Sequence, residues 1–328
     1  MLYHNEMNLR GPAALVGPLC RMAAGGLLAL LVFGVLAAAT PAVAQVPSVV
    51  VSIKPIHSLI TGVMKGIGSP HLMVKGLVSP HAFTLRPSEA RLLENADVVF
   101  WVGEAAEPSL IKPLKSIGSR AHIVELLDVK DIRVLVAREG GAWNARDDDG
   151  HGHGKHVDGH IWLDPRNAIA ITRIAAQVLA KRDPANAPAY RENADGLTDR
   201  LRKLDKDLAK AFMTVKRVPY VVYHDAYQYL ERRFGLNAVG AISAHAGRAP
   251  GARRLRDLRE LVISSGAHCV FHEPQFDPRL VQTLIESTDA ATGILDPMGT
   301  KTEPGEDAYF EIMGDISRVL AMCLDEAG

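Results

Sequence analysis

The chain has 328 residues, of which 48% are hydrophobic and 23% are charged, so it can bury a sizeable core and is long enough for more than one domain. Its 37 basic and 37 acidic residues balance to zero net charge, and only 5% of its residues are aromatic. Nucleic-acid-binding proteins usually carry a basic excess and aromatic surfaces for base stacking, so we exclude nucleic acid as a partner.

The first 44 residues have the pattern of a signal peptide. Arg10 and Arg21 precede an apolar run at residues 27–33, and small residues at Ala42 and Ala44 follow. This small-x-small pattern predicts cleavage after Ala44 and export of the mature chain. A retained membrane anchor is the alternative, but the apolar run is short for a membrane span.

Two cysteines, Cys269 and Cys323, remain once residues 1–44 and Cys20 are removed. Thiols in an exported chain are oxidised by default, so we predict one disulfide between them. The loop that it closes is long, and the chain-entropy model gives such a bond about 4 kcal/mol of stability. Two unrelated buried thiols are the alternative.

Residues 45–184 alternate between strand-like and helix-like patterns. Residues 49–53 and 96–102 are apolar runs of strand length, residues 56–64 have the apolar spacing of a helix, and Asp164-Pro165 begins a helix that runs to about Lys181. Strand, helix and strand in alternation favour a parallel sheet covered by helices. We therefore assign residues 45–184 to a first α/β lobe.

Residues 139–159 break this alternation. The segment is rich in glycine and acidic residues, with Asp147 to Asp149 followed by His151, His153 and His156. It cannot bury enough apolar surface to fold alone, so we predict a mobile loop. A tract of imidazoles and carboxylates binds metal loosely, because ordering it costs entropy, and we assign the loop histidines to an accessory metal site. A solvated spacer is the alternative.

A long helix is predicted from about Ala185 to Thr214. Five apolar residues form one stripe along an otherwise charged rod: Leu197, Leu201, Leu204, Leu208 and Phe212. The stripe is too short for a coiled coil, the alternative interpretation, so we predict a helix over residues 185–216 that links two halves.

A second alternation occupies residues 217–328. Strands are predicted near residues 220–223, 236–242, 269–271 and 294–295, and helices near residues 227–234, 252–264, 278–287 and 308–324. The predicted fold class is α/β, with two lobes that are each a mainly parallel sheet flanked by helices. A long rigid helix joins the lobes, and a ligand would bind in the cleft between them.

Four possible metal ligands lie at or beside predicted strand ends. His81 follows the turn Ser79-Pro80, His160 precedes the strand-like residues 161–163, His224 follows the strand at 220–223, and Asp296 follows Ile294-Leu295. In open α/β sheets, ligands bind outside the carboxyl ends of the strands, so two facing halves would bring these four together. Three imidazoles and one carboxylate suit tetrahedral Zn²⁺, whereas Mn²⁺ prefers more carboxylates.

Each of the four residues also has an ordinary structural role as an alternative. A lone histidine is more often a hydrogen-bonded surface or core residue than a metal ligand. An aspartate before proline favours the start of a turn, so Asp296 could cap the turn that follows it.

Six short motifs occur in order along the chain: Ser52-Ile53-Lys54-Pro55, Pro80-His81-x-x-x-Leu85-Arg86-Pro87-Ser88, His160-x-Trp162-Leu163, His224-Asp225-Ala226-Tyr227, Phe271-x-Glu273-Pro274-Gln275-Phe276 and Leu295-Asp296-Pro297-x-Gly299-Thr300. With them, essentially the whole mature chain closely resembles the zinc-binding component of the high-affinity zinc ABC uptake system, the ZnuA-like periplasmic proteins. The resemblance implies two α/β lobes joined by a rigid helix, with His81, His160 and His224 as zinc ligands between them.

The resemblance also implies a partner, a fourth ligand and a metal preference. The partner is the membrane permease of a zinc ABC importer, and we expect a monomer without enzymatic activity. Some family members have a carboxylate where this chain has Pro80, so the fourth ligand here is Asp296 or a water. Manganese-binding relatives generally have glutamate at the position of His224, which favours zinc, and zinc-binding members often share the disulfide.

Three other functions stay open at this point. A manganese or iron carrier of the same fold is the nearest of them. A zinc hydrolase would need a general base beside a metal-bound water, and Glu273 is the only candidate that we can nominate. A structural or adhesive surface protein would have no need of three histidines at strand ends.

Overall fold

The computed structural model describes residues 45–118, 120–140, 142–143, 156–243, 251–286 and 288–325. The predicted signal peptide and the loop residues His151 and His153 lie outside these ranges. Within the described ranges, no helix combines the length and the apolar character needed to cross a membrane.

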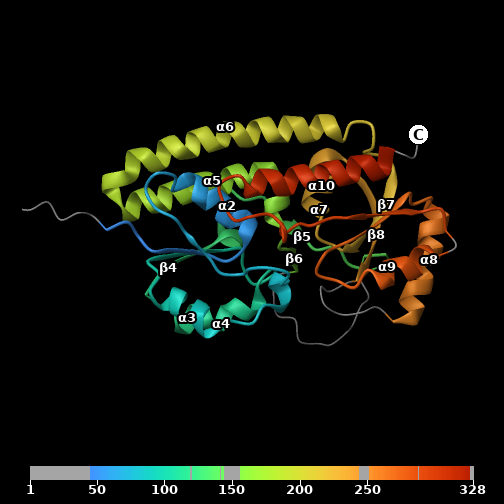
Figure 1. Cartoon of the computed structure of the whole chain (residues 1–328), viewed down its shortest axis with the longest axis horizontal. Helices are drawn as coiled ribbons and strands as arrows, with labels where there is room; N and C mark the ends of the chain where they lie inside the picture. Colours follow the sequence, from blue (N-terminus) through green and yellow to red (C-terminus); the bar gives the residue numbers. More distant parts are fainter. Residues whose placement is uncertain are drawn as a thin grey trace, which may run out of the picture. The chain divides into compact units, whose positions relative to one another are not determined.

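The first sheet is parallel and contains four strands in the order β2-β1-β3-β4. β1 (Val49–Val51) lies between β2 (His71–Leu72) and β3 (Val98–Trp101), and β4 (His122–Glu125) completes the edge. Every residue of β1 and β3 is buried, as expected for parallel strands that are covered on both faces. The covering helices are α2 (Lys54–Val63), α3 (Pro87–Glu94) and α4 (Ile111–Ser116), with α2 on the opposite face from α3 and α4 (Figure 1).

The second sheet is also parallel, with the order β10-β9-β7-β8. Its strands are β7 (Pro219–His224), β8 (Asn237–Ser243), β9 (Cys269–His272) and β10 (Ala291–Ile294). Its helices are α7 (Gln228–Phe234), α8 (Ala252–Ser265) and α9 (Arg279–Ile285). When the strands are numbered within their own sheet, both sheets have the order 2-1-3-4, so the fold repeats one α/β unit. In such a unit the ligand site lies outside the carboxyl ends of the strands, where the strand order reverses.

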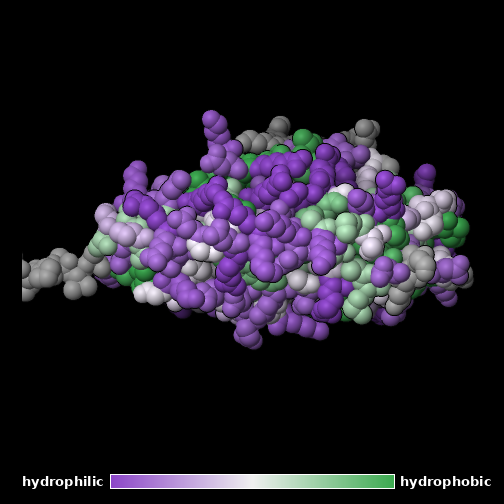
Figure 2. Space-filling view, turned by 90° about the horizontal axis from the view of Figure 1, so that it is seen from above, coloured by the Kyte–Doolittle hydropathy of each residue, from purple (hydrophilic) through white to green (hydrophobic). Residues whose placement is uncertain are grey.

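Two antiparallel helices and a C-terminal helix span the sheets. α5 (Pro165–Arg182) begins after Asp164, whose carboxylate accepts a hydrogen bond from the Arg166 amide at 2.9 Å. α6 (Ala187–Ala211) has 25 residues, and its exposed side forms part of a predominantly hydrophilic face (Figure 2). α10 (Ala308–Asp325) packs against α2, α6 and β10 (Figure 1). The predicted α/β class, with two parallel sheets and a long connecting helix, is confirmed.

One hydrophobic core runs from the first sheet to α10. Its buried members include Val49 and Phe100 of the first sheet, Tyr220 and Phe271 of the second, and Leu320 of α10. Residues 45–328 accordingly form one structural unit. The lobe boundaries at residues 184 and 216 therefore stay predictions.

The predicted disulfide is present and joins β9 to the last helix. Cys269 and Cys323 are bonded with a Cα–Cα distance of 6.3 Å, across 54 residues of sequence. The bond fastens α10 to the second sheet near the end of the chain.

Two local features differ from the sequence-based expectation. Residues Ile161–Leu163 form a short 3₁₀ helix, η5, rather than a strand, and all three are fully buried. The antiparallel pair β5 (Leu135–Val136) and β6 (Val157–Asp158) was not predicted. This pair forms the base of the acidic, histidine-containing segment, because residues 139–156 lie between its two strands.

Candidate metal site

Three histidines from distant parts of the chain meet between the two sheets. His81 lies in the 3₁₀ turn η2 (Pro80–Ala82), His160 comes directly before η5, and His224 is the last residue of β7. His160 and His224 are each 7% exposed, and His81 is half-buried. Among the described residues, they form the one group of three or more His, Cys, Asp or Glu side chains with suitably placed ligand atoms, all within 4.8 Å of one another.

The distances from His160 Nε2 to the Nε2 atoms of the other two rings match those around a tetrahedral ion. Nε2 of His160 lies 3.3 Å from Nε2 of His81 and 3.2 Å from Nε2 of His224. Two nitrogens that each bind a tetrahedral Zn²⁺ at 2.0–2.1 Å are separated by about 3.3 Å. The nitrogens therefore stand where one ion could contact all three.

Two buried carboxylates orient two of the rings. His160 Nδ1 lies 2.7 Å from Asp158 Oδ1, and His224 Nδ1 lies 2.6 Å from Glu273 Oε1. A carboxylate accepts the proton of Nδ1, which leaves the lone pair of Nε2 free to bind a metal. When each ring carries only its Nδ1 proton, the two Nε2 lone pairs 3.2 Å apart repel each other, and a cation between them removes that repulsion.

Burial controls the charge of these groups. It lowers the pKa of His160 to about 3, with the neighbouring His224 adding to the effect, so the His160 ring is neutral at physiological pH. Burial also raises the pKa of Asp158 to about 7 and that of Glu273 above its ordinary value. For His224, burial opposes protonation, but the charge and hydrogen bond of Glu273 are stronger together and raise the pKa of this ring. The carboxylates behind the two rings favour a divalent cation in front of them, and that cation would displace the proton that Glu273 helps His224 to hold.

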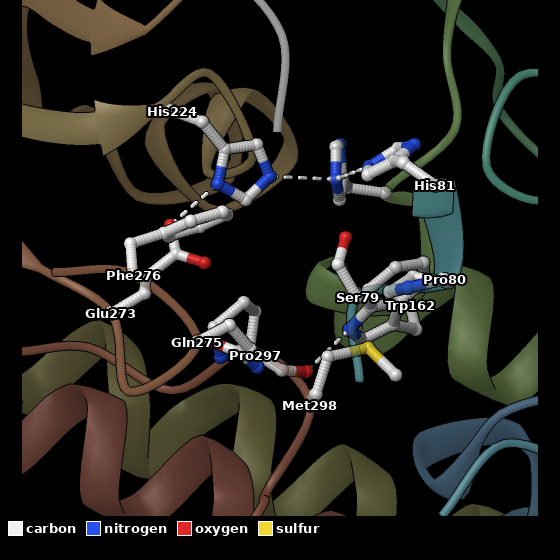
Figure 3. Close-up of a pocket in the computed structure, with 11 residues that line it drawn as sticks. Ser79, Pro80, His81, Trp162, His224, Glu273, Gln275, Phe276, Pro297 and Met298 are labelled. Carbon is white, nitrogen blue, oxygen red and sulfur yellow. Dashed lines mark hydrogen bonds and ion pairs between the residues drawn. The ribbon is translucent and has the colours of Figure 1, made fainter. Parts of the chain in front are cut away.

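A small cavity lies against the three histidines (Figure 3). Its volume of about 10 Å³ leaves room for roughly one water molecule. Trp162, Phe276, Pro297 and Met298 supply apolar walls, and Trp162 Nε1 donates a hydrogen bond to the Pro297 carbonyl at 2.9 Å. The Ser79 hydroxyl points toward the histidines in Figure 3. The site can therefore hold an ion with one small additional ligand.

Asp296 does not join the three histidines. Its Oδ2 accepts hydrogen bonds from the Thr300 amide and hydroxyl, both at 2.6 Å, and its Oδ1 accepts one from the Met298 amide at 3.2 Å. The carboxylate therefore caps the turn after β10, the structural role that its position before Pro297 had left open. Of the two fourth ligands expected from the sequence, Asp296 or a water, Asp296 is not grouped with the three histidines among the described residues.

Of the loop histidines, His156 is the one within the described residues, and it is not part of the cluster. His156 is exposed and its Nδ1 lies 3.1 Å from Glu139 Oε1, at the base of the segment. His151 and His153 lie outside the described residues.

Two residues of the site were missed or misassigned from the sequence. Asp158 was not singled out, although an aspartate two residues before a candidate ligand histidine is well placed to bind its ring. Glu273 was considered only as a general base, whereas it is 2% exposed and hydrogen-bonded to His224.

Comparison with known proteins identifies the family. The family described as "Zinc-uptake complex component A periplasmic" matches residues 49–323. A relative from Brucella suis biovar 1 (strain 1330), named "High-affinity zinc uptake system protein ZnuA", is 39% identical over 309 residues, which cover 85% of this chain and 92% of that protein. The chain belongs to this family of periplasmic zinc-uptake components.

Solved structures share the fold. A zinc-bound ZnuA deletion mutant superposes with a TM-score of 0.71 at 20% identity, covering 85% of this chain and 98% of that one. FpvC from Pseudomonas aeruginosa in complex with Mn²⁺ gives a TM-score of 0.75 at 22% identity, covering 87% of this chain and all of that one. At these identities the likeness extends to the fold alone.

Proposed function

We propose that this chain binds Zn²⁺ through Nε2 of His81, His160 and His224 and delivers it to the membrane permease of a zinc ABC importer. The observation that carries the proposal is the 3.2 and 3.3 Å spacing of the three nitrogens. Family membership supports the transport role, since the related Brucella suis protein is named as part of a high-affinity zinc uptake system.

A water completes the coordination of the ion in this proposal. Asp296 is held in its own turn, and the cavity beside the histidines has room for roughly one water molecule. The Oε1 atom of Gln275 is buried at this cavity with no hydrogen-bond partner, so it can accept a hydrogen bond from that water.

Zinc is favoured over the alternatives by the ligand set. Three imidazoles suit Zn²⁺, whereas Mn²⁺ binds better with more carboxylates. A hydrolase would need a base free to activate the water. Glu273 is engaged by His224 Nδ1, so we propose a carrier without enzymatic activity.

Export and release complete the proposal. Cleavage after Ala44 would free residues 45–328 into the periplasm as a monomer. The acidic segment with His151, His153 and His156 would collect zinc loosely and pass it inward. Because one core spans both sheets, release on the permease would come from local ligand movement rather than from a wide hinge.

The test is a competition titration of purified apo protein against a chromophoric chelator, with Zn²⁺ and Mn²⁺ side by side. His81→Ala, His160→Ala and His224→Ala should each weaken zinc binding sharply, and His71→Ala, on an exposed strand residue, should not. Tight zinc binding that survives all three ligand substitutions would show that the site lies elsewhere in the chain. Tighter binding of Mn²⁺ than of Zn²⁺ would favour the manganese carrier.

A further inference from the structure

Arg138 connects the base of the acidic segment to the residue after His224. It lies two residues beyond β5, and its Nε donates hydrogen bonds to Asp225 Oδ2 at 2.9 Å and to Asp225 Oδ1 at 3.1 Å. Its Nη2 also pairs with Asp225, and its Nη1 donates to Glu231 Oε2 of α7 at 2.6 Å. One guanidinium thus binds two carboxylates that flank the first turn of α7.

This ion cluster is shielded from water. The side chains of Arg138, Asp225 and Glu231 are 18%, 15% and 5% exposed. The guanidinium carbon lies 3.4 Å from the ring centre of Trp143, which covers it as a cation–π partner. A fork that binds two carboxylates and stacks on an aromatic ring is geometry that arginine provides and lysine does not.

The same stretch of α7 also holds the strand behind His160. Tyr229 OH accepts a hydrogen bond from the Leu135 amide at 3.0 Å and donates one to the Asp158 carbonyl at 2.8 Å. When the Gln228 side-chain amide is oriented with its nitrogen toward these acceptors, it donates hydrogen bonds to Asp158 Oδ2 and to the Val136 carbonyl, both at 3.1 Å. Residues 225–231 therefore form hydrogen bonds with both strands of the β5–β6 pair and an ion pair with Arg138 beside it.

We propose that Arg138 is a positioning residue for the metal site, which sets the distance between His160 and His224 without touching the ion. Asp158 orients His160 and lies on β6, while His224 is followed directly by Asp225. Arg138 and its neighbours fix these two segments to each other. The proposal rests on the function proposed above, because it concerns the same site.

The mechanism is one of geometry rather than charge. Partners behind metal ligands hold rings at the angle and distance that the ion requires, and loss of such a partner typically weakens metal binding about 10-fold to 100-fold. If the fork is lost, only the hydrogen bonds of Gln228 and Tyr229, among the described residues, still hold the β5–β6 pair to the start of α7, so the two segments can shift relative to each other. The Nε2 atoms of His160 and His224, now 3.2 Å apart, would then no longer be held ready for the ion.

The experiment compares three variants of the purified protein. Arg138→Gln removes the fork, and Arg138→Lys keeps the positive charge but not the fork. Arg233→Gln is the matched control, because Arg233, which lies on α7 itself, forms a similarly buried ion pair with Asp205, 20% and 18% exposed, away from the metal site. The readouts are zinc affinity by chelator competition, the visible absorption of bound Co²⁺ as a report of ligand geometry, and the unfolding temperature.

We expect both Arg138 variants to bind zinc about 10-fold more weakly and to change the Co²⁺ spectrum. Arg233→Gln should lower the unfolding temperature but leave zinc affinity within twofold and the spectrum unchanged. Arg138→Lys with unaltered affinity and spectrum would overturn the proposal, as would an equal loss of affinity in Arg233→Gln. If the unsubstituted protein itself fails to bind zinc, the proposed function is wrong. That outcome differs from the two results that would overturn the role of Arg138 alone.

Discussion

Nε2 of His224 lies 3.2 Å from Nε2 of His160, and each ring has a carboxylate behind it, Glu273 and Asp158 respectively. The two histidines are 64 residues apart in sequence, and one stands at the end of a strand of the second sheet while the other precedes a 3₁₀ turn. The short distance between the two rings is therefore a property of the tertiary fold. The carboxylates bind Nδ1 of each ring, which leaves the two Nε2 atoms facing each other.

Replacing Glu273 with glutamine tests the role of the carboxylate behind His224. The amide oxygen of Glu273→Gln can still accept the Nδ1 proton, but the negative charge is lost, so we expect zinc binding to weaken about 10-fold with little change in fold. Chelator competition measures the affinity. Glu306→Gln, which removes a surface ion pair with Lys65, is the control and should bind as the unsubstituted protein does. An unaltered affinity in Glu273→Gln would mean that the charge has no part in binding.

The pH dependence of zinc binding should follow His224 rather than His160. Zn²⁺ must displace a proton from any protonated imidazole, so affinity falls as pH drops through the pKa of that ring. Burial keeps His160 neutral, with a pKa of about 3, whereas Glu273 raises the pKa of His224 above 6.5 despite burial. Apparent affinity, measured between pH 5 and pH 8, should therefore begin to fall while the pH is still above 6.5.

The same titration of Glu273→Gln supplies the check on this assignment. Without the carboxylate, the pKa of His224 should fall, and the loss of affinity should begin at a lower pH. An onset that is identical in both proteins would assign the proton to a different group.

The grouping of His81, His160 and His224 could be predicted from the sequence, because each lies at or beside the end of a recognisable element or in a short motif. Asp158 could not be predicted in the same way. The two-residue strand β6 that carries it forms only by pairing with β5, more than 20 residues earlier, and neither strand has enough alternation to stand out. The role of Asp158 depends on that long-range pairing.

Short apolar runs and single polar residues account for the other differences. The three buried residues at 161–163 fit a strand or a tight helix equally well, and only the tertiary core selects the 3₁₀ turn. An aspartate before proline, as at Asp296-Pro297, is compatible with a ligand or with a turn cap, and the hydrogen bonds of Asp296 to Thr300 are those of a cap. The long helices were predicted well, since their apolar patterns extend over many residues. The buried strands β1, β3, β7 and β9 were predicted from short apolar runs, whereas the edge strand β4 was not predicted.

Gly159 permits the close packing that places His160. A Cβ at this position would lie 2.9 Å from both the amide nitrogen and the Cβ of Ala106, so an added methyl group would displace backbone. We expect Gly159→Ala to cost about 1–3 kcal/mol of stability and to weaken zinc binding. Gly196→Ala is the control, because Gly196 lies within α6 with nothing near its Cβ position, and it should stabilise the protein by about 0.5–1 kcal/mol. Equal zinc affinities in Gly159→Ala and Gly196→Ala would mean that the close packing at Gly159 does not position His160 for zinc.

Glu107 should make the protein less stable as the pH rises. This carboxyl is fully buried, and burial raises its pKa to about 7, although the amides of Val102 and Gly103 donate to it. Between pH 4.5 and pH 7 the folded protein keeps a proton that the unfolded chain has lost, so stability falls across this window and is level above it. One pKa unit corresponds to about 1.4 kcal/mol, so the total is about 3 kcal/mol.

Glu107→Gln isolates this contribution. The amide oxygen can still accept the hydrogen bond from the Val102 amide, but the side chain no longer ionises. The measurement is the free energy of unfolding of the apo proteins in denaturant, at pH 4.5 and at pH 8. Relative to the unsubstituted protein, Glu107→Gln should be about 3 kcal/mol more stable at pH 8 than it is at pH 4.5. Glu104→Gln, at an exposed position in the same turn, should show the same difference from the unsubstituted protein at both pH values. A Glu107→Gln variant whose stability changes with pH as that of the unsubstituted protein does would mean that Glu107 is already ionised in the fold, with its charge compensated by the two amides.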